Sequence, residues 1–130
     1  MKKIFIHGIV AGILSAIAGV IYFTIYQNTL ETAFGKIVNI PSIIGGSVLG
    51  SMLIACGYVL LQRMNKIKLA GWYQVLISVV SFATIIGPIS MSLPLSVKSP
   101  ELFPDLVVPM HFFPSLAYFT ISPFFNKQIQ

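Results

Sequence analysis

The sequence alternates between long apolar segments and short stretches that carry its charges. The apolar segments contain no Asp, Glu, Lys or Arg and cover residues 4–30, 37–62, 69–97 and 106–126. Because about 20 helical residues cross the hydrocarbon core of a bilayer, each segment is long enough for one transmembrane pass. The pattern therefore predicts an all-α integral membrane protein, a four-helix bundle with short loops. Its predicted spans are about 4–26, 41–61, 70–91 and 107–125.

Composition supports this fold class. Apolar residues make up 56% of the 130 residues and charged residues 8%, whereas charged residues average about 25% of soluble domains. A soluble fold of this composition would have to bury most of its own surface. We expect a single domain over residues 1–130, because the connections between the apolar segments are too short to hold a second one.

The placement of charges predicts the orientation in the membrane. Six basic residues lie near the chain ends or in the second connection: Lys2, Lys3, Arg63, Lys66, Lys68 and Lys127. The other two lie in the first and third connections with all three acids: Lys36, Lys98, Glu31, Glu101 and Asp105. Because Lys and Arg accumulate on the cytoplasmic side, both termini are expected in the cytoplasm. The Ile- and Lys-rich composition and the MKK start indicate a bacterial inner membrane, and the dispersed basic residues do not predict nucleic-acid binding.

The first apolar segment also has features of a signal peptide. Two lysines precede it, and Ala16 and Ala18 form an A-x-A arrangement. The apolar stretch continues to Tyr26, beyond the 7 to 15 residues that are roughly usual for a signal peptide, which favours retention as the first span. Cleavage would leave three spans in the same orientation.

Small residues predict close packing of the first two helices. Three glycines share one face of the first helix, and three in the second repeat their spacing: Gly8, Gly12, Gly19, Gly46, Gly50 and Gly57. Small residues let helix backbones approach in lipid, where the hydrophobic effect does not drive helices together. The shared spacing fits either an ancient duplication of inverted spans or chance.

Polar residues single out one face of the third helix. Gln74, Ser78, Ser81 and Thr84 follow steps of four, three and three, so they should turn away from lipid. They predict either hydrogen bonds between helices or a small, mostly apolar cavity between the third and fourth helices. In that cavity Gln74 or Tyr118 would orient a neutral or amphiphilic ligand.

Prolines predict that the third and fourth helices are kinked. Gly87 and Pro88 should interrupt or bend the third helix, and Pro114 should kink the fourth, because proline removes a backbone hydrogen bond.

Residues able to do chemistry are few. No carboxylate lies within a span, although ion-coupled transporters usually carry one. The lone Cys56 forms neither an intrachain disulfide nor a Cys-x-x-Cys motif. His7 and His111 are expected near opposite membrane faces, so they cannot form a shared haem or metal site. His111 is the stronger single candidate, as a copper(I) ligand with Met110, as a group that titrates beside an outer acid, or as part of the cavity. We predict no catalytic residue, metal or cofactor.

Two functions fit this sequence. The leading hypothesis is a non-catalytic accessory or scaffold subunit that packs through its glycine faces against itself or a larger membrane complex. The alternative is a small transporter or carrier of a neutral or lipophilic compound that uses the cavity. Glycine faces left exposed after intrachain packing would favour the first function, and a polar-lined cavity in a closed bundle would favour the second. A membrane enzyme ranks third, because a partner or cofactor would have to supply its acid–base groups.

Overall fold

The structure, a computed structural model, describes residues 2–32, 34–94 and 96–125. Within these ranges the regular structure is entirely helical, which confirms the predicted all-α class. The α-helices are α1 (Lys2–Leu30), α2 (Ile40–Arg63), α3 (Ala70–Thr84), α4 (Ile86–Ser90), α5 (Phe103–Met110) and α6 (Phe113–Phe125). Three short 3-10 helices join them: η1 (Phe34–Lys36), η2 (Ile67–Leu69) and η3 (Pro100–Leu102).

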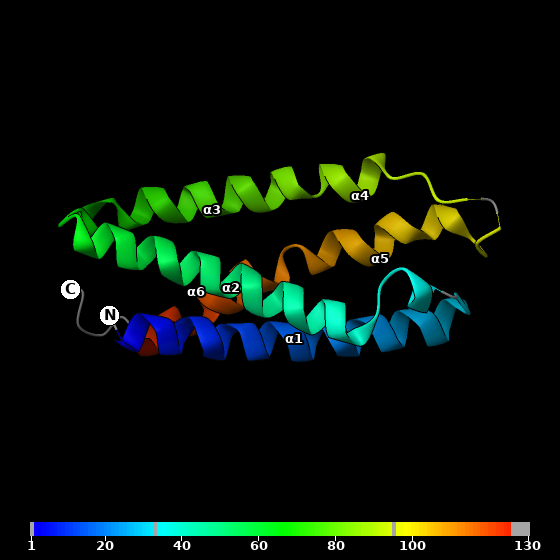
Figure 1. Ribbon diagram of the computed structural model, residues 1–130, viewed down its shortest axis with the longest axis horizontal. Coiled ribbons are helices and arrows are strands. Elements are labelled where there is room, and N and C mark those ends of the chain that lie inside the picture. Colours follow the sequence, from blue (N-terminus) through cyan, green and yellow to red (C-terminus); the bar gives the residue numbers. More distant parts are fainter. Residues whose placement is uncertain (1, 33, 95, 126–130) are drawn as a thin grey trace.

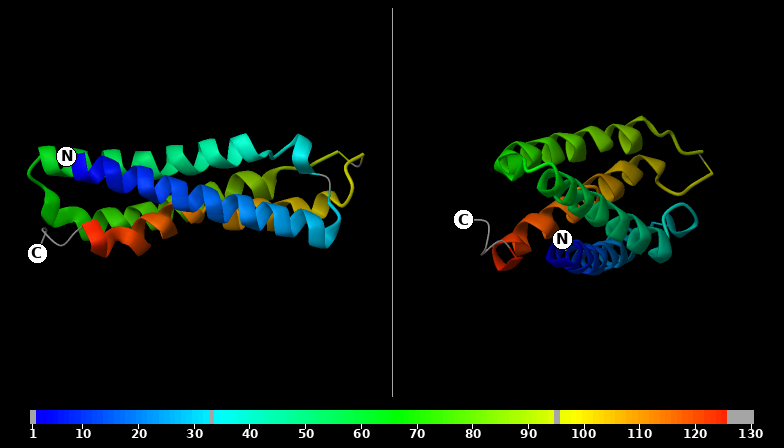
Figure 2. Two further views of the ribbon diagram at one scale, coloured as in Figure 1. Left: turned by 90° about the horizontal axis from the view of Figure 1, so that it is seen from below. Right: turned by 60° about the vertical axis from the view of Figure 1, so that its left-hand side comes forward.

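The helices form an elongated bundle of four antiparallel rods (Figure 1). α1 and α2 are single rods, α3 continues into α4, and α5 continues into α6. The views in Figures 1 and 2 place α3 and α4 on the side of the bundle away from α1. The beginning of α1 and the last turn of α6 lie at the same end of the bundle (Figure 2).

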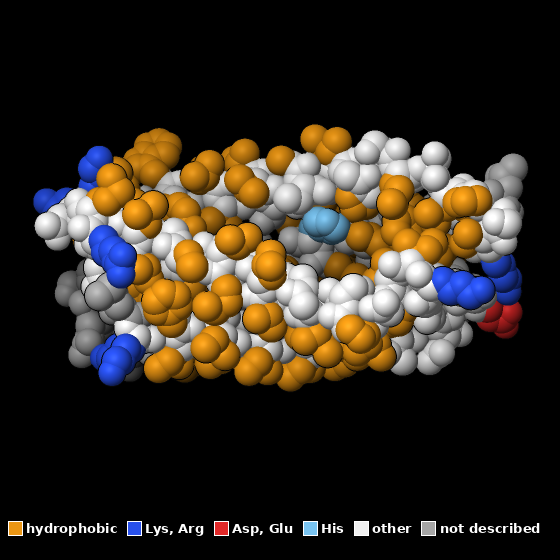
Figure 3. All heavy atoms as spheres, viewed as in Figure 1, with side chains coloured by type: hydrophobic (Ala, Val, Ile, Leu, Met, Phe, Trp, Pro, Cys, Tyr) orange, Lys and Arg blue, Asp and Glu red, His pale blue; other side chains and the backbone are white. Residues whose placement is uncertain are grey.

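The surface of the bundle is strongly apolar. Three helical segments among the described residues are long and apolar enough to cross a membrane: Lys2–Leu30, Ile40–Arg63 and Ile67–Ser90. Leu49, Leu53 and Phe82 are each 63% exposed. Figure 3 shows apolar side chains along the length of one face, with Lys and Arg side chains toward its ends. Large apolar surfaces are rarely left in water, so these features suggest a membrane protein.

The fourth rod is broken near the middle of the bundle (Figure 1). The amides of His111 and Phe112 donate to the carbonyls of Val108 and Pro109, three residues earlier, at 3.2 and 3.1 Å. Pro114 lies in the first turn of α6, and without an N–H it cannot continue the α-helical pattern from α5. The expected kink is therefore a break between two short helices.

The fourth rod also begins earlier than the predicted span at 107–125. It starts at Phe103, because Pro104 occupies the first helical turn, where a proline is well tolerated. The break places His111 within the rod. Because the rod begins at Phe103, His111 lies further from its start than the predicted span at 107–125 implies.

The third rod is interrupted as the sequence predicted. α3 ends at Thr84 and α4 begins at Ile86, so the break comes shortly before Gly87. Pro88 lies in the first turn of α4, where it cannot donate to the Thr84 carbonyl four residues earlier.

Glycines bring α1 and α2 close together. A Cβ on Gly12 would lie 3.0 Å from the Cα of Val48, and a Cβ on Gly8 would lie 2.7 Å from the Cβ of Ala55. A Cβ on Gly19 would lie 2.7 Å from an isoleucine side chain of α2. These separations are shorter than the roughly 3.5–4.0 Å of an ordinary carbon contact, so the two helices could not approach as closely with larger residues.

The glycines of α2 have three different environments. A Cβ on Gly50 would lie 3.2 Å from the ring of Pro114, and one on Gly57 would overlap the Tyr73 phenol. A Cβ on Gly46 would meet no atom of the described residues within 4 Å. All three were predicted to lie on a packing face, whereas a side chain at Gly46 would enter space that the described residues leave open.

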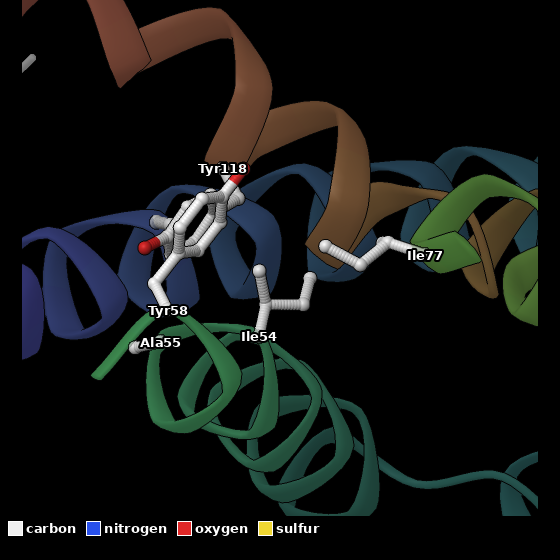
Figure 4. Close-up of a cluster of buried hydrophobic side chains, with 6 residues drawn as sticks. Ile54, Ala55, Tyr58, Ile77 and Tyr118 are labelled. Carbon is white, nitrogen blue, oxygen red and sulfur yellow. The ribbon is translucent and has the colours of Figure 1, made fainter. Parts of the chain in front are cut away.

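Buried side chains form two clusters at different depths along the bundle. One contains Ala11, Ile54, Ala55, Tyr58, Ile77 and Tyr118, most of which Figure 4 shows. The other contains Phe23, Phe34, Ile43, Phe103 and Leu106. Near the second cluster, the hydroxyls of Tyr22 and Tyr26 donate to the carbonyls of Asp105 and Leu102, each at 2.8 Å, which ties α1 to the start of the fourth rod.

Candidate functional site

A cavity of about 580 Å³ lies between α2, α3 and the break in the fourth rod, and it is open to the surface. Its lining includes members of both buried clusters, so it lies between them. Figure 3 shows a hollow on the corresponding face, with a histidine side chain inside it. The volume falls within the roughly 300–1,000 Å³ that is typical of small-molecule sites.

Three features of the sequence create this space. Gly46 and Gly50 have no side chains to fill it from α2. Pro114 breaks the fourth rod opposite them, so regular helix is missing there. α3 stands away from the bundle, since Ile77 is its one buried residue among those described.

Contacts on both sides of the cavity hold α3 in place. Tyr73 donates from its hydroxyl to the Ile54 carbonyl at 3.1 Å, and its ring meets the Tyr58 ring edge-on at 4.9 Å between centroids. Further along α3, Ser81 donates to the hydroxyl of Ser115 at 3.2 Å. Because these contacts are separated along the helix, they support α3 without filling the space between them.

The lining is mainly apolar, with a few polar groups and no Asp, Glu, Lys or Arg among the described residues. Apolar side chains come from all three walls: Leu49, Leu53, Leu76, Val80, Val107, Met110 and Phe113. The polar side chains are Ser42, Ser47, Tyr73, Ser81, Thr84, His111 and Ser115. An uncharged, largely apolar lining suits a neutral, lipophilic molecule, because burying an unpaired charge is costly.

The structure divides the polar stripe that the sequence predicted on the third helix. Ser81 and Thr84 line the cavity, whereas Gln74 and Ser78 do not. The Ser78 hydroxyl donates to the Gln74 carbonyl at 3.1 Å, within its own helix. The Gln74 side chain forms a hydrogen bond with Tyr58 of α2. The stripe therefore combines residues that line the cavity, a hydrogen bond between helices and a hydrogen bond within α3.

The structure places Tyr118 in a buried cluster instead of the cavity. It is 2% exposed, and its ring stacks on His7 at 3.8 Å and on Tyr58 at 5.6 Å between centroids. Figure 4 shows Tyr58 and Tyr118 side by side within this cluster. The predicted role of Tyr118 in orienting a ligand has no support in this arrangement.

His7 is part of the same cluster, although the sequence analysis expected an interfacial position. It is 2% exposed, and its Nε2 lies 2.9 Å from the Tyr118 carbonyl oxygen. Because a carbonyl can only accept, Nε2 carries the proton and donates. The imidazole also stacks on Phe125 at 4.6 Å. His7 therefore joins the beginning of α1 to α6.

His111 is the one sequence-predicted histidine that lines the cavity. Its Nδ1 lies 2.9 Å from the carbonyl oxygen of Val107, one helical turn earlier. Since the carbonyl can only accept, this contact puts the ring proton on Nδ1. In a neutral imidazole, Nε2 is then an acceptor.

The sequence analysis did not identify the contribution of α2 to the cavity. Ser42, Gly46 and Gly50 repeat every four residues and share one side of α2. The neighbouring side, which includes Val48 and Ala55, packs against α1. The sequence does contain a signal for this cavity wall, because small residues lie on more than one side of α2. All of them were predicted to pack against other helices.

The described residues bring together no group of three His, Cys, Asp or Glu side chains that could hold a metal ion. Cys56 is exposed and does not line the cavity. The polar groups of the cavity can bind and orient a ligand through hydrogen bonds. The part of the lining that the structure describes contains no carboxylate to act as an acid or base.

Comparison of the chain with protein-family models, curated proteins and solved structures finds no match.

Proposed function

We propose that this protein binds a neutral, lipophilic compound in the cavity between α2, α3 and the break in the fourth rod, and acts as a small membrane carrier or transporter. The observation that carries the proposal is an uncharged cavity of about 580 Å³ that opens on an apolar surface. A compound dissolved in the bilayer would reach such an opening without crossing water. The few polar groups in the lining would fix its orientation.

The membrane arrangement is part of this proposal. The rods α1, α2, α3 with α4, and α5 with α6 would span the membrane as one four-pass domain of a bacterial inner membrane. The end where α1 begins also carries Arg63, the last residue of α2, and Lys66 and Lys68 between α2 and α3. This placement supports cytoplasmic termini by the positive-inside rule. Lys127, which contributed to the predicted orientation, lies outside the described residues.

The use of the glycines favours a carrier over a scaffold. Gly8, Gly12 and Gly19 pack against α2, while Gly50 and Gly57 pack against the fourth rod and α3. These glycines therefore contact helices of the same chain, and little of the predicted glycine faces is left to bind a partner.

An accessory or scaffold subunit remains the second candidate because of one observation. Ile77 is the one buried residue among the described residues of α3. Large apolar side chains of this helix are exposed, for example Trp72 at 75%. A helix of a larger membrane complex, or of a second copy of the chain, could cover this surface in place of lipid.

A matched pair of substitutions tests the carrier proposal. Gly45 and Gly46 are adjacent on α2 and both have open space beside them, but Gly46 alone of the two lines the cavity. A long-chain primary alcohol bearing a diazirine serves as the photoactivatable probe, with the protein in lipid nanodiscs. Gly46→Leu should strongly reduce labelling of the cavity residues, whereas Gly45→Leu should leave it unchanged. Equal labelling in the two variants would contradict the proposal.

A further inference from the structure

Most polar side chains that line the cavity already donate their hydrogen to another group of the protein. Thr84 donates to the Ser81 carbonyl at 2.8 Å, and Ser115 donates to the Phe112 carbonyl at 3.0 Å. The hydroxyl of Ser81 donates to that of Ser115, and His111 donates through Nδ1 to the Val107 carbonyl. Each of these hydroxyl oxygens, and Nε2 of a neutral His111, retains the ability to accept a hydrogen bond.

Two of the three remaining polar side chains of the lining follow the same pattern. Ser42 donates to the Asn39 carbonyl at 2.7 Å, and Tyr73 donates to the Ile54 carbonyl. The lining side chains therefore present mainly acceptors to a ligand.

Two prolines add backbone acceptors to the same lining. In a regular helix, the amide of Pro114 would donate to the Met110 carbonyl, and the amide of Pro88 would donate to the Thr84 carbonyl. Proline has no N–H, so both carbonyls lack these donors. Met110 and Thr84 both line the cavity. A backbone carbonyl without a partner is costly in the membrane, and a ligand that donates a hydrogen bond would lower this cost.

We propose that the cavity selects lipophilic ligands that carry a hydroxyl group, and that His111 Nε2 accepts the hydrogen bond from it. This inference rests on the proposed function, because it specifies the ligand of the same cavity. A ketone or an ether of the same length can only accept, so it can donate neither to Nε2 nor to a backbone carbonyl.

The volume sets an approximate ligand size. If each non-hydrogen atom occupies about 30 Å³, as a water molecule does in the liquid, a cavity of about 580 Å³ holds a long-chain or isoprenoid alcohol more readily than a whole phospholipid. The absence of charged side chains from the described lining also disfavours anionic and cationic amphiphiles.

The test is competition against the diazirine alcohol in nanodiscs. The competitors are hexadecan-1-ol, its methyl ether and hexadecan-2-one, each added at a defined mole fraction of the lipid. One hydrogen bond should give the alcohol about a fivefold advantage over the other two. In His111→Phe this advantage should disappear. Gly45→Leu, which alters a residue outside the cavity lining, should preserve it.

His111→Gln guards against a folding defect, because its side-chain oxygen restores an acceptor and should recover part of the preference. Equal competition by the three compounds in the wild type would overturn the inference, although the carrier proposal would stand if Gly46→Leu still blocked labelling. A preference that survives His111→Phe would overturn the assignment to Nε2. Failure of every competitor, together with unchanged labelling of Gly46→Leu, would overturn the proposed function itself.

Discussion

Replacing Gly12 by alanine should weaken the bundle by forcing α1 and α2 apart. The added Cβ would lie 3.0 Å from the Cα of Val48, and an ordinary carbon contact needs about 3.5–4.0 Å. The obstacle is backbone, so the helices must separate by roughly 0.5–1 Å. Overpacking of this kind costs about 1–3 kcal/mol.

Gly45→Ala provides the matched control, because a Cβ at Gly45 would meet no atom of the described residues within 4 Å. Glycine to alanine in a helix favours folding by about 0.5–1 kcal/mol, and that gain is common to both variants. The difference between them isolates the steric effect, so Gly12→Ala should be less stable than Gly45→Ala by about 1–3 kcal/mol.

The free energy of unfolding can be measured in mixed micelles titrated with sodium dodecyl sulfate and followed by circular dichroism. Equal stabilities for Gly12→Ala and Gly45→Ala would refute the close approach of α1 to α2. A larger free energy of unfolding for Gly12→Ala than for Gly45→Ala would refute this close approach even more directly.

Three further substitutions test other parts of the account. Gly57→Ala should displace the Tyr73 phenol, break its hydrogen bond to Ile54 and lower the midpoint of thermal unfolding, and an unchanged midpoint would count against this contact. Pro114→Ala should restore a donor for the Met110 carbonyl, extend the helix through the break and reduce probe labelling, and hydrogen exchange should report slower exchange near the break. Ser81→Ala removes one hydrogen bond between helices and should lower the free energy of unfolding by about 0.6 kcal/mol in the same titration. A loss of about 3 kcal/mol would contradict so small a contribution.

The positions of the helices were largely predictable because apolar length is a strong signal. The helical segments Lys2–Leu30 and Ile40–Arg63 contain the predicted first two spans. The fourth rod was harder, since a proline within an apolar segment is compatible with a kink or a complete break. In the structure the rod breaks just before Pro114. The amides of His111 and Phe112 there donate to carbonyls three residues earlier instead of four.

A mostly apolar cavity beside the third and fourth helices was predictable, but the contribution of α2 to its lining was not. Ser81, Thr84 and His111 were among the predicted ligand-binding residues, and they line one cavity. The sequence does not show whether a small residue admits another helix or leaves room for a ligand, so Gly46 was assigned to packing. Tyr118 was misplaced because its partner His7 lies 111 positions away, and helical periodicity carries no signal for such pairs.

Native mass spectrometry of the protein extracted in native lipid particles would show directly whether the cavity holds a neutral compound. The carrier proposal predicts a single chain or a homo-oligomer that retains a neutral compound of reproducible mass. This compound should be lost in Gly46→Leu and kept in Gly45→Leu. A defined complex with other proteins and no such compound would contradict the carrier proposal and support a scaffold subunit.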